Sequence, residues 1–337
     1  MDLRLSAFCA LVAAACIGTA LCGCQSASFE PQTSDPTSQG LDVTSTPVPS
    51  YPNEVRSSGT FSPQAGTAYL YIANQNRNEI DIFPLEGNLQ PQVGTITAGV
   101  DGPYGLWFDT RAQTLYVANQ SNNSVTVYSY GSTTPARTYT KDLERPLYPI
   151  VDRNGNLYVS NGDNGTVVEF SAGSTSACRV LKTPGIETDG LAFDQKGNLY
   201  VAYRTSNGPT AGGIEMFAPG SSVGQVIGMT LDEPQGVVLD TSGNIVVSET
   251  GPTDRIDVFP PASQTASLEV PMPQPSSSHS VATELVIDCN EQYLYVSALY
   301  SGIVFGAEYP LPGQSLFVKD QVSAIIQGTT ITDNQNF

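Results

Sequence analysis

The chain has 337 residues, with 32 acidic side chains against 14 basic ones and a formal net charge of −18. Nucleic-acid-binding proteins need basic stripes to neutralise phosphates, so this surplus of acid excludes a nucleic-acid partner. The single histidine, His279, excludes a zinc site built from several histidines. With 31 glycines, 24 prolines and a 40% apolar fraction, the composition indicates a turn-rich protein with a large core.

Residues 1–23 have the features of a bacterial secretory signal. Arg4 supplies a positive start, and the apolar run that follows from Leu5 is too short and too rich in small residues for a transmembrane helix. The run ends in Leu21-Cys22-Gly23-Cys24, which resembles a lipobox and predicts that Cys24 is lipidated. An ordinary signal peptide with incidental cysteines is the alternative.

The next segment, residues 24–66, is predicted to be a disordered tether. It is rich in Ser, Thr and Pro and lacks apolar periodicity, so it cannot bury enough surface to offset its ordering entropy. Gln25, rather than Asp, follows the lipidation cysteine, which favours the outer membrane. We therefore expect a cell-envelope protein that touches the membrane only through its lipid anchor.

Residues 67–337 contain six copies of a short apolar motif, such as Leu115-Tyr116-Val117-Ala118-Asn119 and Leu157-Tyr158-Val159-Ser160-Asn161. The first residues of the copies are Leu70, Leu115, Leu157, Leu199, Ile245 and Leu294, which are 45, 42, 42, 46 and 49 residues apart. A strand ending in Asp precedes five copies, and a tight turn such as Asn154-Gly155-Asn156 joins the two. Two further strands follow most copies, the last one weaker.

Four strands in each repeat of this length are typical of a propeller blade. The central strands are apolar on both faces, as expected of a blade packed between two neighbours. The first copy lacks an inner strand, whereas the chain ends with one, Gln327 to Asp333, that resembles Gln235 to Asp240. The sequence thus predicts an all-β, six-bladed propeller of four-stranded blades, closed by its C-terminal strand joining blade 1.

The segment Pro234-Gln235-Gly236-Val237-Val238-Leu239-Asp240, followed by Gly243-Asn244-Ile245-Val246-Val247, resembles an NHL repeat. The motif at Leu115 also resembles YVTN-type repeats. The resemblance implies a propeller of the NHL and gluconolactonase-like type, a fold that carries binding scaffolds as well as lactonases and lyases.

In such propellers the ligand face is built by loops that enter the inner strand and leave the second strand. The polar and aromatic residues at these positions that we expect to contact a protein, peptide or glycan are Tyr104, Asn119, Asn161, Tyr203 and Gln235. Our first hypothesis is a monomeric binding or scaffolding module without a cofactor.

The alternative is a metal-dependent, gluconolactonase-like hydrolase. The resemblance implies a divalent ion, calcium or zinc, held by Asp189, Glu249 and Asn161. The pair Asp189-Gly190 stands where that family has Asn-Gly, and its other characteristic segments are absent. An amidating lyase, which also uses NHL repeats, needs several histidines and is excluded.

Two cysteines, Cys178 and Cys289, lie in the repeats. They fall in the third and sixth blades, which are opposite in a ring of six. That separation exceeds the ~7 Å between Cα atoms that a disulfide tolerates, so no bridge between them is expected.

The lipobox gives the first testable prediction. Cys24→Ala removes the thiol that would carry the lipid, so the protein should leave the membrane fraction and lose the mass of the acyl groups. Membrane fractionation and mass spectrometry of the mature protein measure both. Unchanged mass and unchanged membrane association would contradict lipidation at this residue.

Overall fold

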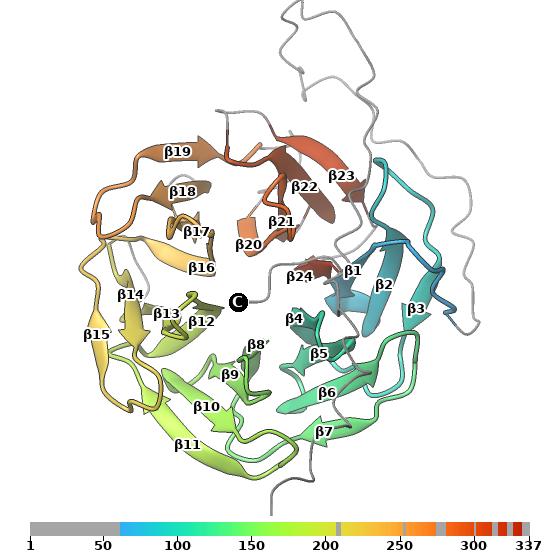
Figure 1. Cartoon of the computed structure of the whole chain (residues 1–337), viewed down its shortest axis with the longest axis horizontal. Coiled ribbons are helices and arrows are strands. Elements are labelled where there is room, and N and C mark those ends of the chain that lie inside the picture. The colour runs from blue at the N-terminus through green and yellow to red at the C-terminus, as the bar shows by residue number, and fades with distance from the viewer. Residues whose placement is uncertain are drawn as a thin grey trace, which may run out of the picture.

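The computed structural model describes residues 61–206, 210–251, 254–273, 281–299, 301–311, 316–321 and 326–331. The signal region with Cys24, the tether up to residue 60 and His279 lie outside them. The described strands form six sheets of four antiparallel strands, arranged as a ring (Figure 1). The predicted six-bladed propeller is confirmed. None of the described helices is long and apolar enough to cross a membrane.

Each blade runs from an inner strand at the axis to an outer strand at the rim. Blade 1 contains β24, and blades 2–6 follow in chain order. The inner strands are β24 (Ile326–Ile331), β4 (Pro103–Asp109), β8 (Pro146–Val151), β12 (Glu187–Phe193), β16 (Glu233–Leu239) and β20 (Val281–Ile287). The second strands are β1 (Tyr69–Asn74), β5 (Thr114–Asn119), β9 (Leu157–Asn161), β13 (Leu199–Arg204), β17 (Ile245–Thr250) and β21 (Tyr293–Leu299).

The fourth strands, at the rim, are mostly shorter and more exposed than the other three strands of each blade. The third strands are β2 (Glu79–Pro84), β6 (Ser124–Ser129), β10 (Thr166–Phe170), β14 (Gly212–Phe217), β18 (Arg255–Phe259) and β22 (Ile303–Glu308). The fourth strands are β3 (Gly94–Ile96), β7 (Arg137–Tyr139), β11 (Ala177–Lys182), β15 (Gly224–Val226), β19 (Leu268–Pro271) and β23 (Phe317–Gln321). A single turn of 3-10 helix, η1 (Gln75–Arg77), follows β1.

Closure of the ring follows the prediction. The C-terminal strand β24 pairs with β1, with Leu70 opposite Ile331 and Tyr71 opposite Thr330. In Figure 1 the red β24 lies beside the blue β1 at the centre of the ring. Blade 1 therefore takes its inner strand from one end of the chain and its other strands from the opposite end, which removes an exposed sheet edge.

Strand direction gives the ring two distinct faces. The upper face carries the loops that enter the inner strands and those between second and third strands. The lower face carries the hairpins between inner and second strands. In these hairpins the last Asp of the inner strand binds the turn, as in blade 3, where Asp152 Oδ1 accepts the N–H groups of Asn154 and Asn156, both at 2.8 Å. Such Asx contacts fix the turn conformation.

Each inner strand carries a bulge near the upper face, where two of its residues oppose one residue of the second strand. The second bulge residue is a glycine in several blades because neighbouring backbones approach closely. A Cβ at Gly190 would lie 2.5 Å from the carbonyl oxygen of Gln235, and one at Gly236 would lie 2.5 Å from that of Thr283. The bulges set which side chains meet at the axis.

Two further findings concern boundaries and cysteines. Phe61, which the sequence places in the tether, is buried and packs edge-on against Tyr69, with ring centroids 4.9 Å apart. The packed body therefore begins before the predicted residue 67, because Phe61 covers aromatic surface of blade 1. Cys178 is free and exposed, so it forms no bridge to Cys289.

Deleting residues 322–337 tests the closure. Loss of β24 leaves β1 without its inner partner, and each orphaned backbone group costs ~1–3 kcal/mol when buried. Several such groups together exceed the ~5–15 kcal/mol stability of a typical domain. We expect the truncated chain to lose its cooperative thermal transition in circular dichroism. A control lacking residues 25–60 should melt like the full chain, and equal melting of both deletions would contradict this closure.

Candidate functional site

Five side chains from the bulges meet at the upper end of the central channel. We call this group the axial plug; it consists of Tyr104, Tyr148, Asp189, Gln235 and Glu284. Four of them are buried, and Gln235 is half-buried. Tyr104, Asp189 and Gln235 were singled out from the sequence, and the structure places them in the bulges of the inner strands rather than in the loops before these strands. These side chains form a closed arrangement at the axis, and their predicted contact with a ligand stays a prediction.

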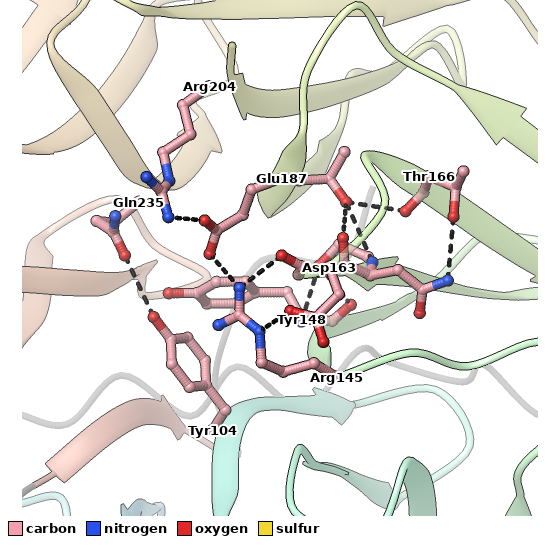
Figure 2. A network of polar contacts seen from close by, with 12 residues as sticks. Tyr104, Arg145, Tyr148, Asp163, Thr166, Glu187, Arg204 and Gln235 are labelled. Carbon is pink, nitrogen blue, oxygen red and sulfur yellow. Dashed lines mark hydrogen bonds and ion pairs between the residues drawn. The ribbon is translucent and has the colours of Figure 1, made fainter. Parts of the chain in front are cut away.

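Tyr104 reaches across the whole ring. Its hydroxyl donates to Gln235 Oε1 at 3.2 Å, which links blade 2 to the opposite blade 5 (Figure 2). Its ring packs edge-on against Tyr148, with centroids 5.5 Å apart, a favourable geometry for aromatic pairs. Burial raises the pKa of Tyr104 well above its ordinary value, so this hydroxyl stays a neutral donor.

Glu284 makes a second link across the axis. Its two carboxylate oxygens accept the backbone N–H of Leu106 at 3.3 and 3.2 Å. This contact joins blade 6 to blade 2, past the inner strand of blade 1. Glu284 takes the bulge position that is glycine in other blades. Its side chain therefore fills space next to the axis that only backbone atoms border in those blades.

Asp189 is the unusual member of the plug. Its side chain is fully buried, and neither carboxylate oxygen has a hydrogen-bond partner. Burial raises the pKa of this carboxyl from its ordinary value of 3.8 to about 8, with Arg145 opposing and Glu233 adding to the rise. A neutral, protonated acid removes the cost of an unpaired buried charge.

A network of ion pairs lies at the upper face beside the plug. We call it the upper rim; it consists of Arg145, Asp163, Glu187 and Arg204 (Figure 2). Arg145 Nη2 lies 2.7 Å from Glu187 Oε1, its Nε lies 2.5 Å from Asp163 Oδ1, and Arg204 pairs with the other oxygen of Glu187. The rim joins blade 3 to blade 4.

Sequence reasoning missed the rim because its residues do not recur from blade to blade. Arg145 immediately precedes the inner strand β8, and Arg204 ends the second strand β13. The backbone N–H of Arg145 donates to Asn123 Oδ1 at 2.8 Å, which fixes the loop that presents its side chain. Two arginines near the ends of neighbouring strands, in a chain with only 14 basic residues, were the available signal.

Asn119 and Asn161 lie away from solvent. Both side chains are fully buried, and each Oδ1 accepts a backbone N–H of the loop entering the inner strand: Asp101 at 2.9 Å and Glu144 at 3.0 Å, respectively. They hold the upper loops in place, and a ligand would reach them only if those loops opened. Tyr203 is also buried; burial first, and the charge of Glu215 second, raise its pKa.

The predicted metal donors belong to three different blades. Asn161 is engaged as described, and Glu249 Oε2 accepts the N–H of Asp232 at 2.8 Å and pairs with Arg255 at 3.2 Å. Only Asp189 has both oxygens without a partner. Within the described residues no group of three or more His, Cys, Asp or Glu side chains is arranged to hold a metal ion. The shared metal site therefore stays a prediction.

Below the plug the channel becomes apolar. A cavity of about 50 Å³ is lined mainly by the inner strands, with Leu106, Ile150, Leu191 and Val237 among its walls. Glu284 also lines it and so marks the boundary between the polar plug and the apolar channel. The two ends of the axis therefore differ in chemistry.

Comparisons with known proteins agree on the fold. No family model matches the chain, and no curated protein matches it. A chain from the crystal structure of a nidogen/laminin complex has a TM-score of 0.64 and 18% identity, covering 79% of this chain and 98% of its own length. A chain of Kuenenia stuttgartiensis hydrazine synthase has a TM-score of 0.56 and 15% identity, covering 71% and 73%.

These similarities and the topology define the class of protein: the chain is a six-bladed β-propeller. At such low identity they show the fold alone, since propellers host many unrelated functions. The resemblance to NHL and gluconolactonase-like repeats stays a prediction.

The buried acid predicts a specific pH dependence. Folded Asp189 keeps its proton up to about pH 8, whereas the unfolded chain releases it near 3.8, so this group destabilises the fold progressively as pH rises between those values. The free energy of unfolding falls by up to about 1.4 kcal/mol for each pH unit in this range. Asp189→Asn cannot titrate, so its melting temperature should rise relative to wild type from pH 5 to pH 8. Parallel melting curves across that range would contradict the assignment.

Proposed function

We propose that this chain is an exported, lipid-anchored binding module whose upper face contacts a protein or peptide. The observation that carries the proposal is the closed axial plug. Tyr104 and Gln235 bond across the ring, and Glu284 bonds to Leu106, so polar side chains bridge the upper end of the axis. A channel mouth bridged in this way favours a macromolecular partner, which binds across a surface, over a small substrate, which needs a concave pocket.

The chemistry of the upper rim supports a protein partner. Arginine, which supplies two of the four rim residues, is enriched at the centres of protein interfaces, where it combines contact area with hydrogen bonding. Arg145 and Asp163 are partly exposed, with 32% and 57% of their side-chain surface accessible, so the rim is available for contact. A propeller of the same fold also occurs in the crystal structure of a nidogen/laminin complex.

The cell envelope as the location is supported by the lipobox and by the tether, both features of the sequence. Anchoring through Cys24 would hold the propeller close to the membrane, and about 40 residues of tether would let its faces turn toward partners. The acidic surplus would disfavour polyanionic partners through repulsion.

A metal-dependent hydrolase is the second candidate, and Asp189 is the observation in its favour. A buried carboxylate without a hydrogen-bond partner is a feature of functional sites as well as of strained cores. Elemental analysis of the purified protein, before and after chelation, separates the candidates. A stoichiometric metal that is lost in Asp189→Asn, together with loss of lactone hydrolysis, would favour the enzyme.

Site-directed photo-crosslinking tests the binding module. A photoreactive amino acid at Asp163, on the upper face, should give a discrete protein adduct in intact cells. The matched control places it at Ser242, an exposed residue in the lower-face hairpin of blade 5, and should give none. Because Asp163 and Ser242 are both exposed, a difference in adduct formation between them does not come from burial of one position.

The same experiment defines failure. Equal adducts from Asp163 and Ser242, or none from either, would contradict a protein contact at the upper face. If a specific adduct forms, Arg204→Ala should weaken it, because Arg204 supports Glu187 and, through it, Arg145.

A further inference from the structure

A groove on the lower face has no role in the function proposed above. We call it the lower groove; it lies between blades 3 and 4 and encloses about 430 Å³, within the ~300–1,000 Å³ typical of small-molecule sites. Blade 3 contributes its lower hairpin and parts of its second, third and fourth strands, and blade 4 contributes two turns. Its lining residues include Arg153, Asn154, Tyr158, Glu169, Arg179 and Lys196.

Two unmatched cations stand at the edges of this groove. Arg153 and Lys196 occupy the lower hairpins of the two blades, and both are exposed. Neither forms an ion pair with any described residue. Both side chains line the groove without an ion-pair partner among the residues that the structure describes.

The hairpins that carry these cations are rigid, and they occupy the nearby acids. Asp194 Oδ1 accepts the N–H groups of Lys196 and Asn198 at 2.9 and 2.8 Å, as Asp152 does in blade 3. Each carboxylate is thus turned into its own hairpin. Fixed supports lower the ordering entropy that a ligand must overcome on binding.

The inner wall of the groove is also fixed. Arg179 Nε donates to Glu169 Oε2 at 2.5 Å, and its Nη1 donates to the carbonyl of Ser221 at 2.9 Å, which ties blade 3 to blade 4. Tyr158 and Phe193 pack edge-on across the blades, with centroids 5.3 Å apart. Glu169 neutralises Arg179. The other lining acid, Asp152, is bound within its own hairpin, and Arg153 and Lys196 at the edges outnumber it, so the lining carries a surplus of one positive charge.

We propose that the lower groove binds a small anionic ligand, namely a carboxylate or phosphate group on a polyhydroxylated body of about monosaccharide size. In this proposal Arg153 and Lys196 bind the anionic group from the two blades. Their hydrogen bonds to it are charge-assisted, and such bonds are stronger than those between neutral groups. Asn154, whose exposed amide lines the groove, offers a donor and an acceptor to the hydroxyl groups. Three basic and two acidic residues line this groove, so it carries a local positive surplus in a protein whose net charge is −18.

Isothermal titration calorimetry with defined probes tests the proposal. The probes are glucuronate and glucose 6-phosphate, and neutral glucose is the reference ligand. We expect an anion to bind and glucose to bind at least about tenfold more weakly, with anion affinity falling as salt rises. Binding of glucuronate alone or of glucose 6-phosphate alone identifies the anionic group.

Matched variants locate the site. The double variant Arg153→Ala/Lys196→Ala should lose about tenfold or more in affinity while keeping the wild-type melting temperature, because both side chains are exposed and unpaired. Lys141→Ala is the control: it removes an exposed cation that lies on the upper face, beside Asp142. It should bind like wild type.

Three outcomes would overturn the proposal. One is the absence of binding by both anions up to about 10 mM, a range that covers weak metabolite sites. Another is unchanged affinity in the double variant, and the third is equal loss in Lys141→Ala. None of these outcomes bears on crosslinking from Asp163, so failure here is distinguishable from failure of the proposed upper-face contact.

Discussion

The close approach of six inner strands at one axis is the constraint on which the rest of this structure depends. At Gly105, Gly190 and Gly236 an added Cβ would meet the backbone of the next blade at 2.4–2.5 Å. Glycine is the only residue that tolerates such contacts without displacement of a strand. The bulges that contain these glycines also take two residues per inner strand out of the ladder, and their side chains become available to fill the axis.

Two blades have a residue other than glycine at the second position of the bulge. Tyr148 and Glu284 take its place in blades 3 and 6, and serines of the second strand accept their backbone N–H groups: Ser160 at 2.9 Å and Ser297 at 3.1 Å. Ser248 does the same for Gly236 at 2.8 Å. The repeated motif has Ser in some blades and Ala in others at this position. A Ser hydroxyl accepts the hydrogen bond of the bulge N–H, whereas an Ala methyl group cannot.

The sequence was sufficient for the fold and for part of the site. Repeats in register predicted the blades, and the final strand predicted closure. Tyr104 and Gln235 were expected on the loops that enter the inner strands, and they lie in the bulges of β4 and β16. The burial of Asn119 could not be predicted. An Asn at the end of a strand has the same sequence pattern whether its side chain faces solvent or binds the backbone of a nearby loop. The contact of Arg145 with Glu187 depends on two loops that no repeat relates.

The two faces of the ring differ in how their charged side chains are paired. On the upper face the arginines are matched by carboxylates, and the buried Asp189 stays protonated, so burial there adds little unpaired charge. On the lower face Arg153 and Lys196 are unmatched, because the aspartates beside them are held by their own hairpins. A surface whose charges are already paired offers a partner shape and hydrogen bonds, whereas unmatched charges attract a counter-ion. The same repeat thus carries paired charges on the upper face, where we propose a macromolecular contact, and unpaired cations in the lower groove, where we propose an anion site.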